Sequence, residues 1–342
     1  MPIWTEEKKE RITNAAKPQK GKINMCTPAS FVVTKKNKDL RAFWHEDVSD
    51  SHEDIIEYFN LKEQNVRGEI TLVRVEVVPP DSDYTLPVSK WEFMLDQDIL
   101  PDWYDAEATE KACRKELAAW KRAKIILPSK KLAVLDGKRC VVRVYSTIKK
   151  IHGEAKIDHV CGKAKIGHVY GEAKIDYVSD KAKIGHVFGK AKIDSVCDEA
   201  QIGYVYDEAK IGIIFGKAQI GSVHDEAKID SVFGKAKIGS VFGTAKIGSV
   251  SDKAQISHVH GEAKIGYVSD KAKIGTIFGK AKIDYVYDEA KIGSVFGKAQ
   301  IGSVCNEAKI GSVCDEAEID SVYDKAKISH VHDKAKIIKD NR

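Results

Sequence analysis

Residues 227–244 read AKIDSVFGK AKIGSVFGT, two consecutive copies of one nine-residue unit. The unit repeats from Ala155 to Ala335, where an alanine occupies every ninth position without insertion or deletion. Its consensus is Ala-Lys-Ile-[Gly/Asp]-x-Val-x-[Gly/Asp]-[Lys/Glu], and we number its positions 0 to 8 from the alanine. Self-similarity at a fixed short period predicts a stacked solenoid.

The apolar positions of the unit indicate which residues face the interior. Position 2 is always Ile, and position 5 of every full copy is Val, or Ile at Ile214 and Ile277. Ala-x-Ile has the period of two that a strand requires, whereas the step of three from Ile to Val breaks it. We therefore expect a bend at position 3 and another at position 7, with two short strands per unit, Lys-Ala-Lys-Ile and x-Val-x.

The residues at the two expected bends support this interpretation. Position 7 holds Gly, Asp or Asn, as in Gly162, Asp180 and Asn306, and position 3 holds Gly, Asp or Ser, as in Gly167. Gly, Asn and Asp share sites where the backbone enters left-handed or tight-turn geometry. Both positions are therefore predicted to be corners.

Two coil lengths fit a nine-residue unit. A coil of nine residues would bury little more than Ala, Ile and Val, so we favour eighteen residues and four sides per coil, with nine as the alternative. Cys305 and Cys314 separate the two, because both lie at position 6 and are nine residues apart. Only the nine-residue coil would stack them within disulfide reach, with Cα atoms about 5.5 Å apart.

The Ala-x-Ile half of each unit, over residues 155–337, resembles the pentapeptide-repeat family, whose core pair is a small residue and a Leu or Phe two positions on. The resemblance implies a β-solenoid with a square coil. The other half, V-x-[G/D]-[K/E], has four residues instead of five and departs from that family's geometry. In general appearance the chain resembles repeat-bearing accessory proteins of bacteria and their phages. The period of nine is also that of the repeats-in-toxin calcium roll, but the Gly-Gly-x-Gly-x-Asp ligand pattern is missing.

The residues before the array predict a small α+β domain over 1–130, followed by a capping hairpin and a degenerate repeat over 131–154 and the all-β solenoid over 155–342. Asp136-Gly137 is a type I′ turn signal between the two strands of the expected hairpin. Alternating and amphipathic patterns place the elements of the first domain. They are helices at 5–16, from Ser51 and at 106–124, and strands at 30–34, 40–44, 69–78 and 91–95.

Composition excludes several classes of protein. The 342 residues carry a net charge of +5, and the array is close to neutral, which excludes a rod that mimics DNA. Position 1 is Lys in 16 of 21 copies, with acidic residues at positions 3, 7 and 8 available as partners. Seven cysteines without CxxC spacing indicate neither a disulfide framework nor a zinc site. We expect a cytoplasmic protein, because the first residues lack an apolar signal-peptide core and no apolar run approaches membrane-spanning length.

No catalytic motif is recognisable. The chain lacks G-x-S-x-G, a P-loop and G-x-G-x-x-G, so we assign no catalytic residue and predict no cofactor. His45, Asp47 and His52 lie in a cluster rich in His and carboxylates and are the candidate metal ligands. Their spacing does not match a metal-binding helix, and Ser51 has a capping role available.

The variable positions of the array define a candidate binding surface. Positions 4 and 6 flank the inward Val and are expected to point outward, where aromatic rings on a rigid lattice would suit recognition. The alternative is that position 6 packs against a corner. The candidate residues are His186, Phe188, Tyr204, Tyr206, Phe233, Phe242, Phe278 and Phe296.

These observations favour a non-catalytic structural or interaction protein, whose rod presents a repetitive surface to a protein partner. One alternative is an enzyme or a nucleotide- or metal-binding amino-terminal domain with the rod as an assembly device. Another is binding of a polyanion or nucleic acid by the Lys rows. Nucleic acid is the less favoured partner, no membrane partner is expected, and the carboxy-terminal edge of the solenoid could support self-association.

Overall fold

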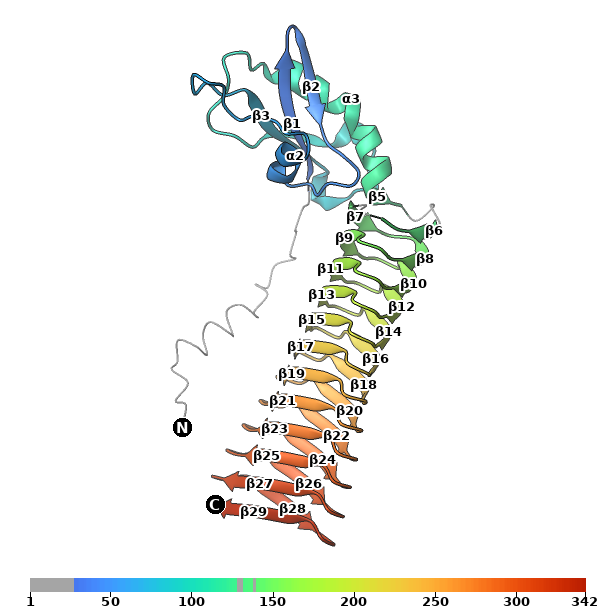
Figure 1. Ribbon diagram of the computed structural model, residues 1–342, viewed down its shortest axis with the longest axis vertical. Helices are drawn as coiled ribbons and strands as arrows, with labels where there is room; N and C mark the ends of the chain where they lie inside the picture. Colours follow the sequence, from blue (N-terminus) through green and yellow to red (C-terminus); the bar gives the residue numbers. More distant parts are fainter. Residues whose placement is uncertain (1–27, 128–131, 138–139) are drawn as a thin grey trace. The chain divides into compact units, whose positions relative to one another are not determined.

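The computed structural model describes residues 28–127, 132–137 and 140–342 (Figure 1). The chain divides into two compact units, the first ending at Arg122 and the second beginning at Ala123. The helix expected at 5–16 lies outside the described residues.

The first unit contains a four-stranded antiparallel sheet in the order β2-β1-β3-β4. All four strands were expected near the positions where they lie, because Val, Ile and aromatic residues alternate there with polar ones. Two single-turn 3-10 helices, η1 (Pro80–Ser82) and η2 (Val88–Lys90), connect β3 to β4. The strands are β1 (Ala29–Lys36), β2 (Asp39–Phe43), β3 (Leu72–Val78) and β4 (Glu92–Leu95).

Two helices accompany this sheet, α2 (His52–Tyr58) and α3 (Ala106–Lys124). Ser51 caps α2 as predicted, because its side chain accepts a hydrogen bond from the backbone N–H of Asp54. Asp105 does the same for α3 by accepting from the backbone N–H of Ala108 at 2.7 Å.

Helix α3 has an apolar stripe that is buried, since Cys113, Leu117 and Trp120 are each 0% exposed. Trp120 meets Trp91 edge to face, with ring centroids 6.0 Å apart. A large aromatic core therefore stabilises a domain of modest size.

The second unit is a parallel β-solenoid with eighteen residues per coil, as favoured from the sequence. Each strand pairs with the strands two before and two after it, so that Lys165 pairs with Lys183 and Ile166 with Ile184. The odd-numbered strands form a 13-stranded sheet, here the odd sheet, and the even-numbered strands form a 12-stranded sheet, here the even sheet (Figure 1).

The strands follow the repeat closely, and almost all of them span positions 1 to 5. Those of the odd sheet are β5 (Ile125–Ile126), β7 (Cys140–Val144), β9 (Lys156–Val160), β11 (Lys174–Val178), β13 (Lys192–Val196), β15 (Lys210–Ile214), β17 (Lys228–Val232), β19 (Lys246–Val250), β21 (Lys264–Val268), β23 (Lys282–Val286), β25 (Gln300–Val304), β27 (Glu318–Tyr323) and β29 (Lys336–Asn341). Those of the even sheet are β6 (Leu132–Leu135), β8 (Thr147–Ile151), β10 (Lys165–Val169), β12 (Lys183–Val187), β14 (Gln201–Val205), β16 (Gln219–Val223), β18 (Lys237–Val241), β20 (Gln255–Val259), β22 (Lys273–Ile277), β24 (Lys291–Val295), β26 (Lys309–Val313) and β28 (Lys327–Val331).

The prediction of two short strands per unit, and hence of a four-sided coil, is wrong. One five-residue strand spans positions 1 to 5, so each coil has two strands, one in each sheet. The pairing register joins positions 1, 2, 4 and 5 and omits position 3. This local irregularity lets Ile at position 2 and Val at position 5 both face inward, although they are three residues apart.

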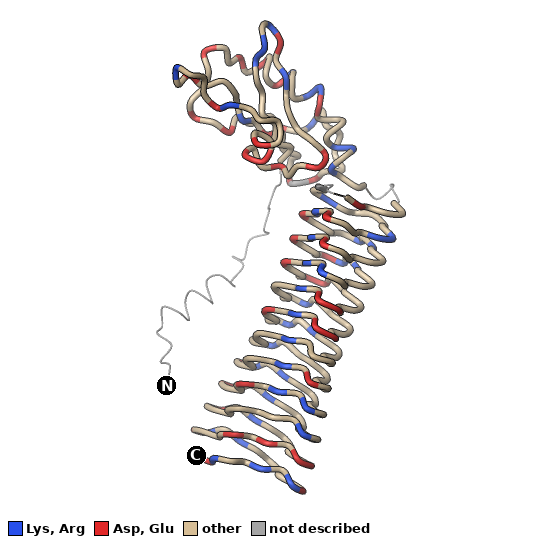
Figure 2. Tube along the Cα trace, in the orientation of Figure 1, with Lys and Arg blue, Asp and Glu red and all other residues tan. Residues whose placement is uncertain are grey.

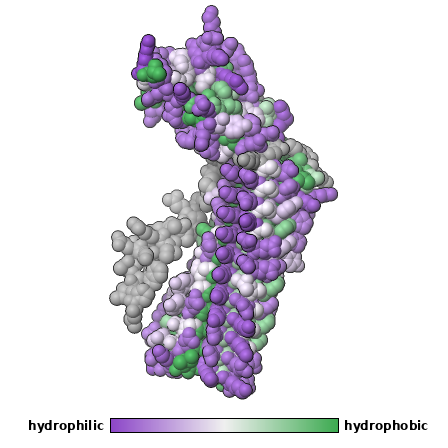
Figure 3. Space-filling model, in the orientation of Figure 1, coloured by the Kyte–Doolittle hydropathy of each residue, from purple (hydrophilic) through white to green (hydrophobic). Residues whose placement is uncertain are grey.

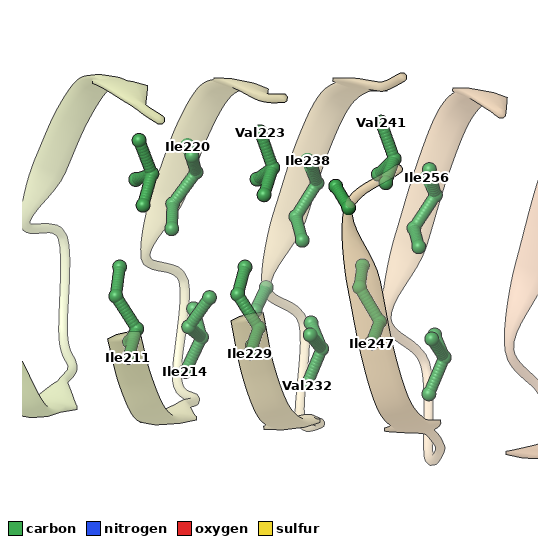
Figure 4. Close-up of a cluster of buried hydrophobic side chains, with 14 of the residues drawn as sticks. Ile211, Ile214, Ile220, Val223, Ile229, Val232, Ile238, Val241, Ile247 and Ile256 are labelled. Atoms are coloured by element: carbon green, nitrogen blue, oxygen red, sulfur yellow. The ribbon is translucent and has the colours of Figure 1, made fainter. Parts of the chain in front are cut away.

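The interior consists of the repeated Ala, Ile and Val residues. Ile220 and Val223 from the even sheet face Ile211 and Ile214 from the odd sheet across the coil (Figure 4). These four side chains are at most 2% exposed. A single hydrophobic core extends from Ile126 to Ala326, and burial of so much apolar surface is the main source of stability.

Position 7 is a corner, as predicted. Gly234 has φ +71° and Asp252 has φ +55°, a left-handed conformation that Gly, Asn and Asp tolerate best. Asp252 also accepts a hydrogen bond at 3.1 Å from the backbone N–H of Gly234, one coil earlier. An aspartate at this position thus accepts a hydrogen bond from a corner N–H group that has no partner in the sheet.

The hairpin expected within residues 131–154 does not form. Strand β6 pairs in parallel with β8, and β7 pairs in parallel with β9, so the two strands belong to opposite sheets. Gly137, with φ +73°, is a solenoid corner instead. The Asp-Gly pair correctly predicted a turn, but it did not predict which strands pair. A residue in the left-handed conformation occurs both in hairpin turns and in solenoid corners.

Candidate binding surface of the solenoid

Side chains at equivalent positions stack along the solenoid because each coil repeats the one before it. Residues eighteen apart are therefore neighbours, and residues nine apart lie on opposite sides. Cys305 and Cys314 follow strands of opposite sheets, and both are free thiols. We call positions 6 to 8 after an even-sheet strand the even corner, and those after an odd-sheet strand the odd corner.

The even corner carries nine aromatic or imidazole rings in one continuous stack, here called the ring ladder. Neighbouring centroids are 4.7–5.6 Å apart, and all but the first pair are parallel to within 13°. The ring ladder consists of His152, Tyr170, Phe188, Tyr206, His224, Phe242, His260, Phe278 and Phe296.

The rings are half-buried, and their faces cover one another. Solvent therefore meets mainly the ring edges, which form an apolar strip along the corner. Such stacks contribute about 0.5–1.5 kcal/mol per pair beyond simple burial. The ring ladder thus stabilises the corner and also presents a rigid, repetitive surface.

Two further candidates, His186 and Tyr204, occupy position 4 of the even sheet beside the ring ladder. Their rings stack at 5.0 Å, and His186 also meets Tyr206 edge to face at 6.0 Å. Tyr204 is 48% exposed, so this second row reaches further into solvent than the ladder. Seven of the eight candidate residues accordingly lie on one side of the solenoid.

Phe233 is the exception. It lies on the odd corner, where it stacks on Phe215 with centroids 5.4 Å apart. The remaining position 6 residues on that corner include Cys161, Ser251 and Ser269, so no continuous stack forms there. The candidates that the sequence grouped together therefore belong to two separate corners.

Burial within these rows shifts several titrations. Desolvation lowers the pKa of His260, and the neighbouring His258 adds to the effect. Desolvation also lowers the pKa of His186, with a smaller contribution from His168. The pKa of Tyr206 is raised by burial first and then by nearby carboxylates. Burial therefore favours the uncharged forms of His260, His186 and Tyr206.

Ion pairs between coils link the corner residues at position 8. Glu199 lies 3.4 Å from the Nζ atom of Lys217 and 3.8 Å from that of Lys181, and Lys280 lies 3.2 Å from Glu262. Charged residues of both signs follow the coils along the whole solenoid (Figure 2), and a hydrophilic band runs along its length in one view (Figure 3). Exposed pairs of this kind contribute little individually.

The structure gives the candidate metal ligands of the first unit separate partners. The His45 ring stacks on Tyr58, and its Nδ1 atom lies 3.8 Å from Asp47. His52 is 6% exposed, with Nδ1 3.2 Å from the Asp96 carboxylate and Nε2 3.1 Å from the Val75 carbonyl oxygen. Within residues 28–127, 132–137 and 140–342, no group of three or more His, Cys, Asp or Glu is arranged to hold a metal ion.

Sequence reasoning missed the continuity of the ring ladder, and four of its members, His152, Tyr170, His224 and His260, were not among the candidate residues. Reading position 6 at every eighteenth residue would have revealed it, because alternate copies then separate into an aromatic row and a mixed row.

No family model, curated protein or solved structure matches this chain. Among the described residues no helix is long and apolar enough to cross a membrane. The fold and the surface geometry are therefore the observations on which a function can be proposed.

Proposed function

We propose that this protein is a non-catalytic interaction protein whose solenoid presents the ring ladder to a protein partner. The observation that supports this proposal is the ladder itself, nine rings at a spacing close to that of the strands. Each coil from His152 to Phe296 offers a ring at the same place, which suits a multivalent or extended contact. An active site, by contrast, needs residues with unique roles.

Aromatic edges held on rigid strands suit a protein interface because little side-chain entropy remains to be lost on binding. Aromatic residues are also enriched in the well-packed centres of such interfaces. The coarser role, a solenoid rod in a structural or interaction setting, agrees with the fold. We also propose that the protein is cytoplasmic and that it is related to the short-period solenoid proteins of bacteria and phages.

The test uses the full chain and two matched sets of substitutions. One variant carries Phe188→Ser, Phe242→Ser and Phe278→Ser in the ring ladder. The control carries Phe215→Ser, Phe233→Ser and Tyr287→Ser on the odd corner, where Ser251 and Ser269 already occupy position 6. Quantitative mass spectrometry of captured proteins is expected to show partners lost by the ladder variant and kept by the control. A partner set unchanged by the ladder variant would contradict the proposal.

Self-association through the last coil remains a second proposal. Val331 is 43% exposed, whereas Val313, its partner in the preceding coil, is 0% exposed. An exposed strand edge with apolar side chains can pair with another copy. Light scattering over a range of protein concentrations tests this, and a constant monomer mass would contradict it.

A metal- or nucleotide-binding role for the first unit also remains a proposal. His45 is its best candidate, because His52 already contacts Asp96 and Val75. Metal analysis of the full chain and of His45→Ala tests it, and equal metal content in the two samples would argue against this role.

A further inference from the structure

The outer faces of the two sheets differ in charge. None of the twelve even-sheet strands, from β6 to β28, contains Asp or Glu, although nine lysines lie in them. Odd-sheet strands carry carboxylates at position 3, as in Asp176, Asp194 and Asp230, on the same face as their lysines at position 1. Carboxylates therefore accompany the lysines in part of the odd face, and in none of the even-sheet strands.

The lysines of the even face follow one another in four successive strands, β22 to β28. Lys273, Lys291 and Lys309 occupy three successive coils, and none of the ion pairs found among the described residues involves them. Neighbouring parallel strands lie about 4.8 Å apart, so three ammonium groups follow one another at close intervals along the solenoid axis.

A shallow groove of about 680 Å³ runs beside this lysine row, from Gln255 to Ser329. Gly275, Gly293 and Gly311 line its floor, and Thr276 and His258 line the opposite wall. Since the glycines have no side chains, the strand backbone is accessible at the floor. The groove crosses the strands and could therefore receive an extended chain parallel to the solenoid axis.

Packing alone does not explain the absence of carboxylates. A Cβ atom on Gly293 would lie 2.4 Å from the carbonyl oxygen of Gly275, so the local backbone favours glycine. Yet Asp158, Asp176 and Asp194 occupy position 3 in three successive odd-sheet coils, and Ser257 occupies it in the even sheet. A side chain can thus be accommodated at position 3, but the even face never has an acidic one.

Two carboxylates of the odd corner, Glu289 and Glu307, precede Lys291 and Lys309 by two residues. Glu289 is paired with Lys271, at 3.6 Å. At position 8 of that corner, the copies from Lys163 to Lys325 contain seven lysines and three glutamates. Beside Lys273, Lys291 and Lys309 this position holds Lys271, Glu289 and Glu307, so the lysine row itself supplies the positive charge of the groove.

We propose that the even face binds a linear acidic polysaccharide, with sugar carboxylates on the lysine row and the chain in the glycine-floored groove. Regularly spaced carboxylates complement ammonium groups that repeat with each coil. The hydroxyl groups of Thr276, Ser257 and Ser329, which line the groove, offer hydrogen bonds to sugar hydroxyls. This surface is distinct from the ring ladder and uses different residues.

Single-stranded nucleic acid is the less suitable ligand. Proteins that bind it provide exposed aromatic faces on which bases stack. The ladder rings cover one another's faces, and His258, the one ring lining the groove, accepts or donates a hydrogen bond at 2.7 Å with Thr276. The groove thus offers charge and hydroxyl groups, as a polyuronate requires, but few stacking surfaces.

The test measures binding of the full chain to a size-fractionated oligogalacturonate at low salt. The probe is compared with its fully methyl-esterified form, which has the same backbone without charge. The even-face variant carries Lys273→Gln, Lys291→Gln and Lys309→Gln. The control carries Lys156→Gln, Lys174→Gln and Lys192→Gln on the odd face, in three successive strands that each contain an Asp. Gln201, Gln219 and Gln255 occupy position 1 naturally, so both variants are expected to fold.

We expect the even-face variant to bind about tenfold more weakly, as three exposed ion pairs would predict. The odd-face control should stay within about twofold of the unmodified protein, and the methyl ester should not bind. Absence of binding, equal losses in the two variants, or binding of the ester would overturn the proposal. Tighter binding of an oligothymidylate of equal charge would overturn the choice of ligand. None of these results bears on capture of proteins by the ring ladder, so the two proposals fail separately.

Discussion

The two sheets of the solenoid share one interior, but their outer faces differ. Ile and Val are buried to the same degree in both, as Ile229 and Ile238 show at 1% exposure each. Outside, several odd-sheet strands carry Asp beside Lys, whereas the even sheet has Lys or Gln beside Gly or Ser and is followed by the ring ladder. Two copies of the nine-residue repeat form one coil, with one copy in each sheet. Because alternate copies differ on the surface, the structural unit has eighteen residues.

The largest effect is expected from charge placed in the shared interior. Ile238→Lys in the even sheet and Ile229→Lys in the odd sheet should each destabilise the neighbouring coils by on the order of 5 kcal/mol, because a buried ammonium without a partner is costly. Thermal unfolding followed by circular dichroism measures this. Unequal losses would show that the two sides of the interior are not equivalent.

A pH effect distinguishes the first coils from the rest. Burial, with a smaller contribution from Arg143, lowers the pKa of His159 from 6.5 to about 3. As the pH falls, the imidazole is protonated in the unfolded state before it is protonated in the folded state. The free energy of unfolding therefore has its full value above about pH 6.5 and decreases as the pH drops toward 3. The loss is on the order of 3–5 kcal/mol.

Substitution of His159 by Tyr, the residue at the next odd-sheet copy, Tyr177, removes this titration. Melting of the unmodified protein and of the variant at pH 7 and pH 4 should show a smaller pH-dependent loss in the variant. Equal losses would indicate that His159 can be protonated within the fold.

The ring ladder should make the even corner more sensitive to ring removal than the odd corner. Phe242 has stacked neighbours on both sides, whereas Phe233 stacks on Phe215 alone. Phe242→Ser is expected to cost about 2–3 kcal/mol, and Phe233→Ser about 1 kcal/mol less. Denaturant unfolding of the two variants provides the measurement, and a larger cost for Phe233→Ser would refute the assigned role of the ladder.

The smallest effect concerns the corner aspartates, which both corners share. Asp252→Ala loses the hydrogen bond from Gly234 and places Ala at positive φ, for a cost of about 2 kcal/mol. Asp252→Gly loses the hydrogen bond but keeps the favourable backbone, so its cost should be less than about 1 kcal/mol. If the two variants melt alike, backbone conformation does not determine the choice of residue at position 7.

The sequence predicted the solenoid, its eighteen-residue coil and its interior because Ala, Ile and Val never vary in spacing. It also predicted the cap of α2, since Ser51 acts on a residue three positions away. Local rules were sufficient for these features.

Features that depend on pairing between distant residues were harder to predict. The bend at position 3 was interpreted as a corner because periodicity cannot distinguish a corner from a strand with one unpaired residue. Strands β6 and β7 were expected to pair with each other, whereas each pairs with a later strand. The ring ladder and the uncharged groove floor likewise depend on which copies become neighbours.

The two-sheet coil is tested most directly by finding which residues of adjacent coils are neighbours. Tyr323→Cys places a thiol eighteen residues from Cys305 at the same position of the next odd-sheet coil, whereas Cys314 is nine residues away on the other corner. Mild oxidation followed by peptide mass spectrometry should detect a disulfide between residue 305 and the new thiol at 323, because residues paired in adjacent strands lie within disulfide reach. A disulfide between Cys305 and Cys314 instead would contradict the two-sheet coil and every surface assigned to it.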